Sequence, residues 1–132
     1  RILLESEALR QSIPLLEPSD IAQARGYIQQ LENETRHAEI GRLNRLLHMA
    51  LYSKAKNKKL LRLIEDELNE EERFLRFHLS SMGLGKLTQD DHNALVNAAG
   101  DKHVEEAITV LERHLNSGAR VIRKYLDGQP RH

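Results

Sequence analysis

Cysteine and tryptophan are absent from this sequence, and aromatic residues make up only 4% of it. The lack of cysteine excludes disulfide bonds and thiolate metal ligands, so any bound metal must use histidine, carboxylate, amide or water ligands. The sequence also has no apolar run long enough to span a membrane and no recognisable signal peptide. We therefore expect a cytoplasmic protein that makes no contact with membranes.

An excess of either charge is absent as well, because 20 lysine and arginine residues balance 20 aspartate and glutamate residues. Phosphate binding needs a basic surface, so we do not expect this segment to bind nucleic acid by itself. The sequence begins at Arg1, inside an expected helix and without an initiator methionine. We therefore expect it to be a segment of a longer protein.

Proline and glycine are scarce, with three and seven residues among 132, a length that suits one domain. The composition favours good helix formers, and no segment alternates in the manner of a strand. We predict an all-α fold, an antiparallel bundle of about six helices. The expected helices cover residues 1 to about 12, 18 to about 34, about 41 to 53 and 60 to about 80, then a helix opened by Thr88–Asp91 and closed by Gly100, and a last helix capped by Asp101.

The stretch from Arg42 to Leu51 has apolar residues at positions 43, 46, 47, 50 and 51, the pattern of an amphipathic helix with one buried stripe. Asn44 and His48 border this stripe four residues apart, so both side chains can reach one point. An imidazole nitrogen and an amide oxygen are suitable ligands for a divalent metal. A histidine that is simply packed beside the core explains the same pair.

Two further histidines, His92 and His114, lie beside the apolar stripes of two other expected helices. Histidines from three helices of one bundle can converge on a central cavity, where each buried ring needs a partner. One shared metal would satisfy all three, and Asn44 would complete the ligand set. The other four histidines, which have more polar neighbours, are His37, His78, His103 and His132.

Several short motifs follow one another in a fixed order: Arg1-Ile2-Leu3-Leu4-Glu5, Asn44-x-x-x-His48, Lys56-Asn57, Asp91-His92-Asn93-Ala94-Leu95, Gly100-Asp101 and Arg113-His114-Leu115. Their order and spacing resemble the FCD domain, the all-helical effector-binding domain of GntR-family bacterial transcription regulators. The resemblance covers nearly the whole chain. It implies that residues 1–132 form an effector-binding domain, and that the winged-helix DNA-binding domain expected upstream is absent from this chain.

The resemblance also implies that Asn44, His48, His92 and His114 are metal-ligand positions, typically for zinc or nickel, with a small organic acid bound over the ion. Position 44 departs from the family, which usually has aspartate there. An amide keeps the oxygen but loses the negative charge, so we expect weaker metal binding. Some relatives bind their effectors without a metal, and that alternative stays open.

The remaining expectations concern the effector and the partner. Arg1 and Arg76 are candidates for pairing with an effector carboxylate, because a guanidinium offers a bidentate fork. We expect a homodimer, because a regulator that reads a two-fold DNA operator needs two DNA-binding domains. The expected apolar lining of the effector cavity is Leu47, Leu51, Leu95 and Leu111, and candidates for the dimer face are Leu63, Phe74 and Phe77.

Two other functions compete with an effector-binding domain. A metal-dependent hydrolase would also use three protein ligands and a water, but it needs a general base. Asp90, Asp91 and Glu112 neighbour the histidines in sequence, and helix caps or solvated acids explain them equally well. A plain helical interaction domain with core histidines would have neither a metal nor a cavity. We favour the effector-binding domain and do not expect an enzyme.

Overall fold

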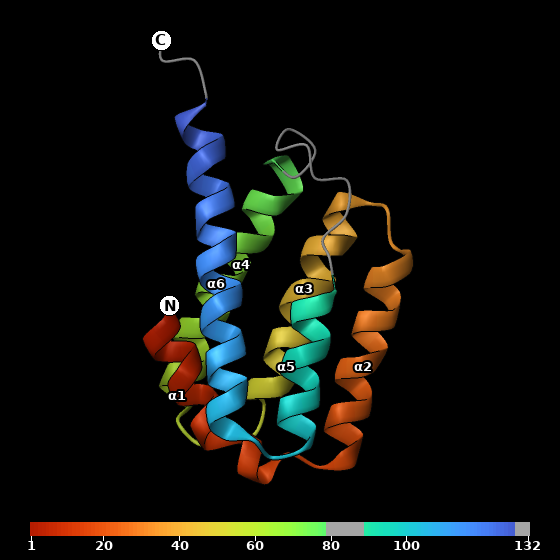
Figure 1. The fold of residues 1–132 in the computed structure, drawn as a ribbon, viewed down its shortest axis with the longest axis vertical. Helices are drawn as coiled ribbons and strands as arrows, with labels where there is room; N and C mark the ends of the chain where they lie inside the picture. The colour runs from red at the N-terminus through yellow and green to blue at the C-terminus, as the bar shows by residue number, and fades with distance from the viewer. Residues whose placement is uncertain (79–88, 129–132) are drawn as a thin grey trace.

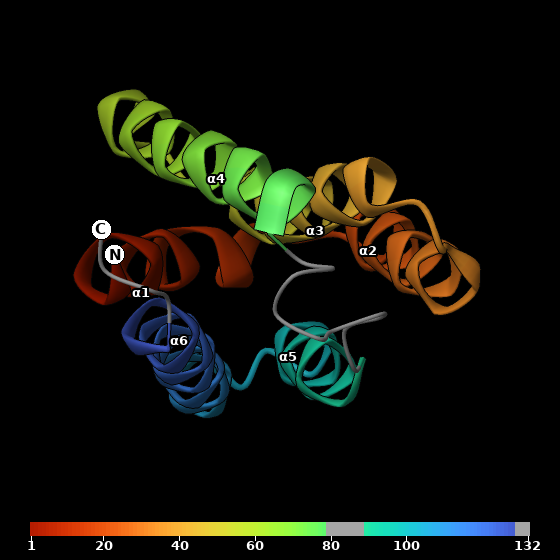
Figure 2. The ribbon, with the colours of Figure 1, turned by 90° about the horizontal axis from the view of Figure 1, so that it is seen from above.

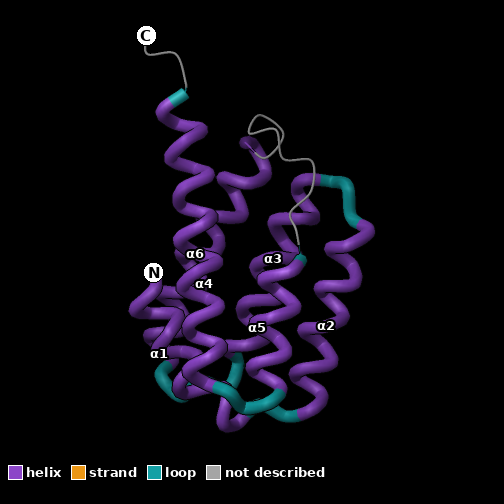
Figure 3. The backbone as a smooth tube through the Cα atoms, in the orientation of Figure 1, coloured by secondary structure: helices purple, strands orange, loops and turns teal. Residues whose placement is uncertain are grey.

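The computed structural model describes residues 1–78 and 89–128, and every regular element within these ranges is a helix. The α-helices are α1 (Ile2–Ser12), α2 (Pro18–Asn33), α3 (His37–Tyr52), α4 (Lys58–His78), α5 (Asp90–Gly100) and α6 (Val104–Asp127), and a short 3-10 helix, η1 (Ile13–Leu15), follows α1. Figures 1 and 3 show the bundle from the side. The prediction of an all-α bundle of six helices is confirmed, while the predicted capping residue Thr88 lies outside the described ranges.

The helices pack side by side around a common interior, as the view from above in Figure 2 shows. Helix α3 packs against α2 and α4, α5 packs against α2 and α6, and α1 lies between α4 and α6 and also contacts α3. None of the helices in the described part of the chain is long and apolar enough to cross a membrane. Three of them, α3, α5 and α6, carry the histidines singled out in the sequence.

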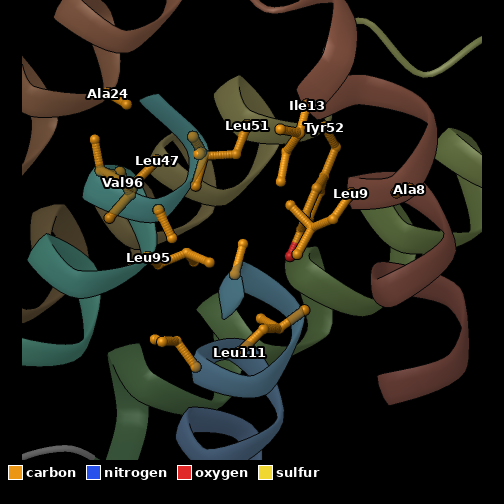
Figure 4. Packing of buried hydrophobic residues seen from close by; sticks show 14 of the residues in the cluster. Ala8, Leu9, Ile13, Ala24, Leu47, Leu51, Tyr52, Leu95, Val96 and Leu111 are labelled. Carbon is orange, nitrogen blue, oxygen red and sulfur yellow. The ribbon is translucent and has the colours of Figure 1, made fainter. Parts of the chain in front are cut away.

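The core is built from the apolar stripes that the sequence predicts. Leu47 and Leu51 of α3 are fully buried, together with Leu95 of α5 and Leu111 of α6, and Figure 4 shows these side chains in one cluster. Burying a leucine side chain stabilises the folded state by about 1.5–3 kcal/mol. Burial of this stripe therefore fixes the rotation of α3 about its axis, which also decides where Asn44 and His48 lie.

Gly41 was expected near the start of its helix, but α3 begins four residues earlier, at His37. A Cβ atom at Gly41 would lie 3.2 Å from both the Cγ and the carbonyl oxygen of Glu72, closer than such contacts normally come. Glycine here allows α3 and α4 to approach each other closely. The approach aligns Asn44 with Glu71, and a hydrogen bond of 2.9 Å joins them.

The turn between α5 and α6 differs from the expectation that Asp101 caps the last helix, since α6 begins only at Val104. Lys102 takes a positive φ of 62° in this turn, an uncommon conformation for a residue with a side chain. Its Nζ donates a 2.9 Å hydrogen bond to the carbonyl oxygen of Ile13. The turn is thereby fixed to η1, which holds α5 and α6 together against the end of α1.

Candidate metal centre

Three histidines from three helices meet in the structure: His48 of α3, His92 of α5 and His114 of α6. Their ring centroids are 5.5 Å apart for His48 and His92, 5.7 Å for His48 and His114, and 5.1 Å for His92 and His114. One ligand atom from each residue lies within 4.8 Å of those of the other two. His48 and His92 are buried and His114 is partly exposed, so the cluster lies at the edge of the interior.

The hydrogen bonds around His92 and His114 determine which ring nitrogen carries the proton. The Nδ1 of His92 lies 2.8 Å from Oε1 of Gln89, and the Nδ1 of His114 lies 3.2 Å from Oδ2 of Asp91. An amide oxygen and a carboxylate oxygen accept hydrogen bonds, so Nδ1 is the donor in both rings. In the neutral form of either ring the unprotonated nitrogen is then Nε2, whose lone pair is available to a metal.

In His48, a contact with a tyrosine likewise places the ring proton on Nδ1. The hydroxyl of Tyr52 donates a 2.6 Å hydrogen bond to Oε1 of the buried Glu5 and lies 3.4 Å from Nδ1 of His48. Because the single hydroxyl proton goes to Glu5, the tyrosine oxygen must accept the proton of His48 Nδ1. Metal-binding histidines typically donate their second ring nitrogen to such an outer acceptor, which fixes the tautomer.

The Nε2 atoms of His48 and His92 are buried and have no hydrogen-bond partner among the described residues. Burial is the main reason that the pKa of His48 falls well below its ordinary value, and the neighbouring His92 and His114 lower it further. Burial likewise lowers the pKa of His92 to about 3, with a further contribution from His114. Both rings are therefore neutral at pH 7, the state in which imidazole binds metals. A shared divalent ion would satisfy the two buried nitrogens, so these residues fit a metal.

Asn44 lies one helical turn before His48 and is buried. Its Nδ2 donates to Oε1 of Glu71, which leaves the amide oxygen as its other polar atom. Glu71 also pairs with Nη1 of Arg1, whose Nε donates a 2.6 Å hydrogen bond to Glu5. Burial lowers the pKa of Arg1, but the two glutamates outweigh this effect and raise it above its ordinary value. Arg1 is therefore a permanent cation beside the histidine cluster.

An open pocket of about 430 Å³ borders the cluster, and its polar lining includes Arg1, Glu71 and His114. Its apolar lining includes Ile2, Leu3 and Leu115. The four leucines expected to line a cavity lie instead in the solid core, where all are almost completely buried. A small ligand in this pocket would contact His114 and a guanidinium at the same time.

The other predicted residues lie elsewhere. Arg76 is exposed on α4 and does not line this pocket. His37 is half-buried at the start of α3, and His103 is exposed, with its Nδ1 3.1 Å from Glu106 Oε2. The side chains of His78 and His132 lie outside the described part of the structure.

Sequence reasoning missed four residues of the site. Tyr52 and Gln89 were detectable, because they lie four and three residues from His48 and His92, within reach along one helix. The sequence did not indicate that Glu5 and Glu71 belong to the site, because each lies on a different helix from the site residue that it contacts. Asp91 was noted as a possible base, and the structure places it beside His114 and Arg113 instead.

The chain is similar to known proteins in both sequence and structure. The sequence pattern of the FCD domain matches residues 1–117. Among solved structures, the chain is similar to a transcriptional regulator described as a GntR family member, from Pseudomonas syringae pv. tomato str. DC3000. The two share 59% identity and superpose with a TM-score of 0.94 over 97% of this chain and 54% of that one. No curated protein sequence matches. The chain therefore belongs to the FCD domain family of GntR-type transcriptional regulators.

Proposed function

We propose that this domain senses a small carboxylate through a divalent metal ion, and that the bound state controls DNA binding by a separate winged-helix domain. His48, His92 and His114 would hold the ion through their Nε2 atoms, with Asn44 as a fourth ligand through its amide oxygen. The observation that carries the proposal is the pair of buried, unpartnered Nε2 atoms on His48 and His92. Burying polar atoms without partners costs free energy, which a metal would offset.

Zinc and nickel suit this ligand set better than magnesium or calcium, because imidazole is the main donor. Three neutral imidazoles and an amide leave the charge of the ion uncompensated by its direct ligands. A carboxylate in the adjoining pocket would reduce that charge, in surroundings where electrostatic attraction is stronger than in water. The effector therefore belongs to the small organic acids, bound beside His114.

Arg1 is the better supported of the two arginines proposed for effector binding. It lines the pocket and is held between Glu5 and Glu71, which use its Nε and Nη1 atoms. Its Nη2 takes part in neither of these contacts and could donate to a carboxylate. The role of Arg76 in effector binding stays a prediction, since its side chain is exposed on α4.

The domain belongs to a family of regulators and is not an enzyme, so the hydrolase alternative is set aside. The chain spans about half of the solved regulator that it matches, with 54% of that chain covered. We propose that the remainder of the whole protein includes the DNA-binding domain, and that the regulator acts as a cytoplasmic homodimer. A ligand that contacts several helices favours the packing arrangement that binds it better. This shift between arrangements can alter DNA affinity.

A thermal-shift screen tests the effector proposal. Small mono- and dicarboxylates, each paired with its neutral amide, are added to zinc-loaded and to chelator-treated protein. A ligand that binds only the folded state raises the melting temperature. We expect acids to give shifts that vanish on chelation. Shifts that survive metal removal would indicate a metal-free site, and larger shifts from the amides would reject a carboxylate effector.

A further inference from the structure

Glu71 of α4 contacts two residues of the proposed site. Its Oε1 accepts a 2.9 Å hydrogen bond from Nδ2 of the buried Asn44, and its Oε2 pairs with Nη1 of Arg1. The side chain of Glu71 is 21% exposed, so this contact is partly shielded from water. Glu71 therefore joins the ligand helix α3 to the cation that lines the effector pocket.

The hydrogen bond decides how the amide of Asn44 is oriented. An amide has a donor end and an acceptor end, whereas an ionised carboxylate only accepts. Glu71 therefore holds the NH₂ group, and this hydrogen bond does not use Oδ1. Asn44 precedes His48 by four residues and shares its helix face, so Oδ1 is the atom that a metal at the histidines would use.

The same contact places negative charge beside a ligand residue, as Asp91 does beside His114. Asn44 and the three histidines contribute none, while Glu71 carries a carboxylate one hydrogen bond away from Asn44. We infer that Glu71 is a positioning residue of the metal centre: it directs the Asn44 oxygen to the ion and supplies outer negative charge, so that residues 44 and 71 act as a pair. This inference rests on the metal site proposed above.

If residues 44 and 71 act as a pair, the effect of a substitution at position 44 depends on the residue at position 71. An aspartate at position 44 would bring a second carboxylate to about the 2.9 Å separation now spanned by a hydrogen bond. The two like charges would repel each other, so Asn44→Asp gains less metal affinity than its added charge alone implies. In the double variant, Glu71→Gln removes the repulsion, and its amide can donate to the carboxylate that Asn44→Asp introduces. The amide and the carboxylate have then changed places between positions 44 and 71.

A double-mutant cycle measures this coupling. Zinc affinity is determined by competition with a chromophoric chelator for the wild type, Glu71→Gln, Asn44→Asp and the double variant. Glu72→Gln is the matched control, because Glu72 is the neighbouring α4 glutamate and pairs with Arg45 rather than with Asn44. Melting temperatures of the same proteins without metal provide a second readout.

We expect Glu71→Gln to weaken zinc binding about tenfold or more, as removal of outer partners typically does, while Glu72→Gln changes it less than twofold. Asn44→Asp should tighten binding at least tenfold more in the Glu71→Gln background than in the wild type. Without metal, Asn44→Asp should lower the melting temperature, and adding Glu71→Gln should restore it.

Three outcomes would overturn the inference. An equal effect of Asn44→Asp in both backgrounds would show that the positions are independent. Equal affinities of Glu71→Gln and Glu72→Gln would remove any special role of Glu71. If the wild type binds no zinc, the proposed function fails together with this inference, whereas zinc binding without coupling rejects the inference alone.

Discussion

The hydroxyl of Tyr52 donates a 2.6 Å hydrogen bond to Oε1 of Glu5, and this contact joins α3 to α1 next to His48. Both residues are completely buried. Burial, followed by the proximity of Glu5, raises the pKa of the Tyr52 phenol well above its ordinary value, so the phenol keeps its proton. The tyrosine therefore acts as a fixed donor to Glu5 and a fixed acceptor for His48.

Tyr52→Phe should destabilise the metal-free protein by about 1.5–3 kcal/mol, the range for a hydrogen bond to a charged group, because Glu5 would lose its buried donor. Zinc affinity should fall roughly tenfold, since the ring of His48 would lose its outer acceptor. Urea unfolding and chelator competition measure the two effects. Tyr27→Phe on α2 is the matched control, where the hydroxyl accepts a 3.2 Å hydrogen bond from exposed Gln23. Equal effects of the two substitutions would contradict the role of Tyr52.

Metal content should depend on three histidines and not on the others. His48→Ala, His92→Ala and His114→Ala each remove one imidazole of the cluster and should lose nearly all bound metal. His37→Ala and His103→Ala should retain it, because those residues lie apart from the cluster. Elemental analysis of protein purified without an affinity tag decides the matter, and equal metal content in all five variants would refute the assignment.

The metal-free protein should lose stability as the pH falls from 7 to 5.5. The folded-state pKa of His92 is lowered to about 3 by burial, and that of His48 is lowered as well. Below the unfolded value of about 6.5 the unfolded chain therefore binds protons that the folded chain excludes, so the free energy of unfolding decreases. The loss over this interval is about 1 kcal/mol for each histidine.

Urea titrations at several pH values on chelator-treated protein measure this slope. His92→Gln should have a smaller pH dependence, because it removes one of the two neutral buried rings. Saturating zinc should raise the free energy of unfolding without removing the slope from these two rings, because both are already unprotonated in the metal-free folded state. A stability that is constant from pH 7 to 5.5 without metal would contradict the buried, neutral state of both histidines.

The prediction of a homodimer is tested through α4. Leu63 is 53% exposed on this helix, Phe74 is partly buried, and the side chain of Phe77 lies outside the described residues. If α4 forms the dimer contact, Leu63→Glu should convert the dimer into a monomer, because a charge would enter an apolar interface. Light scattering gives the mass, and Leu15→Glu is the control, since Leu15 is a similarly exposed leucine on η1. A wild-type monomer at high concentration would exclude self-association through this domain.

The spacing of apolar residues along the chain was enough to predict the helices and the faces that they bury. The recurrence of leucine and alanine every three or four residues predicts both, because an α-helix repeats every 3.6 residues and burial follows the apolar stripe. Histidines at the border of three stripes were therefore expected to face a common interior. His48, His92 and His114 could be chosen among seven histidines for this reason, and Asn44 could be added because it precedes His48 by one helical turn.

Which residues from other helices support that site depends on how the helices pack against one another. Glu71 reaches Asn44 because Gly41 lets α3 and α4 approach closely, and Glu5 reaches Tyr52 because α1 packs against α3. Such contacts depend on the distance and register between helices, which the periodicity within one helix does not encode. The pocket beside Arg1 and His114 has the same origin, since it forms where separate helices meet at the surface rather than within any single stripe.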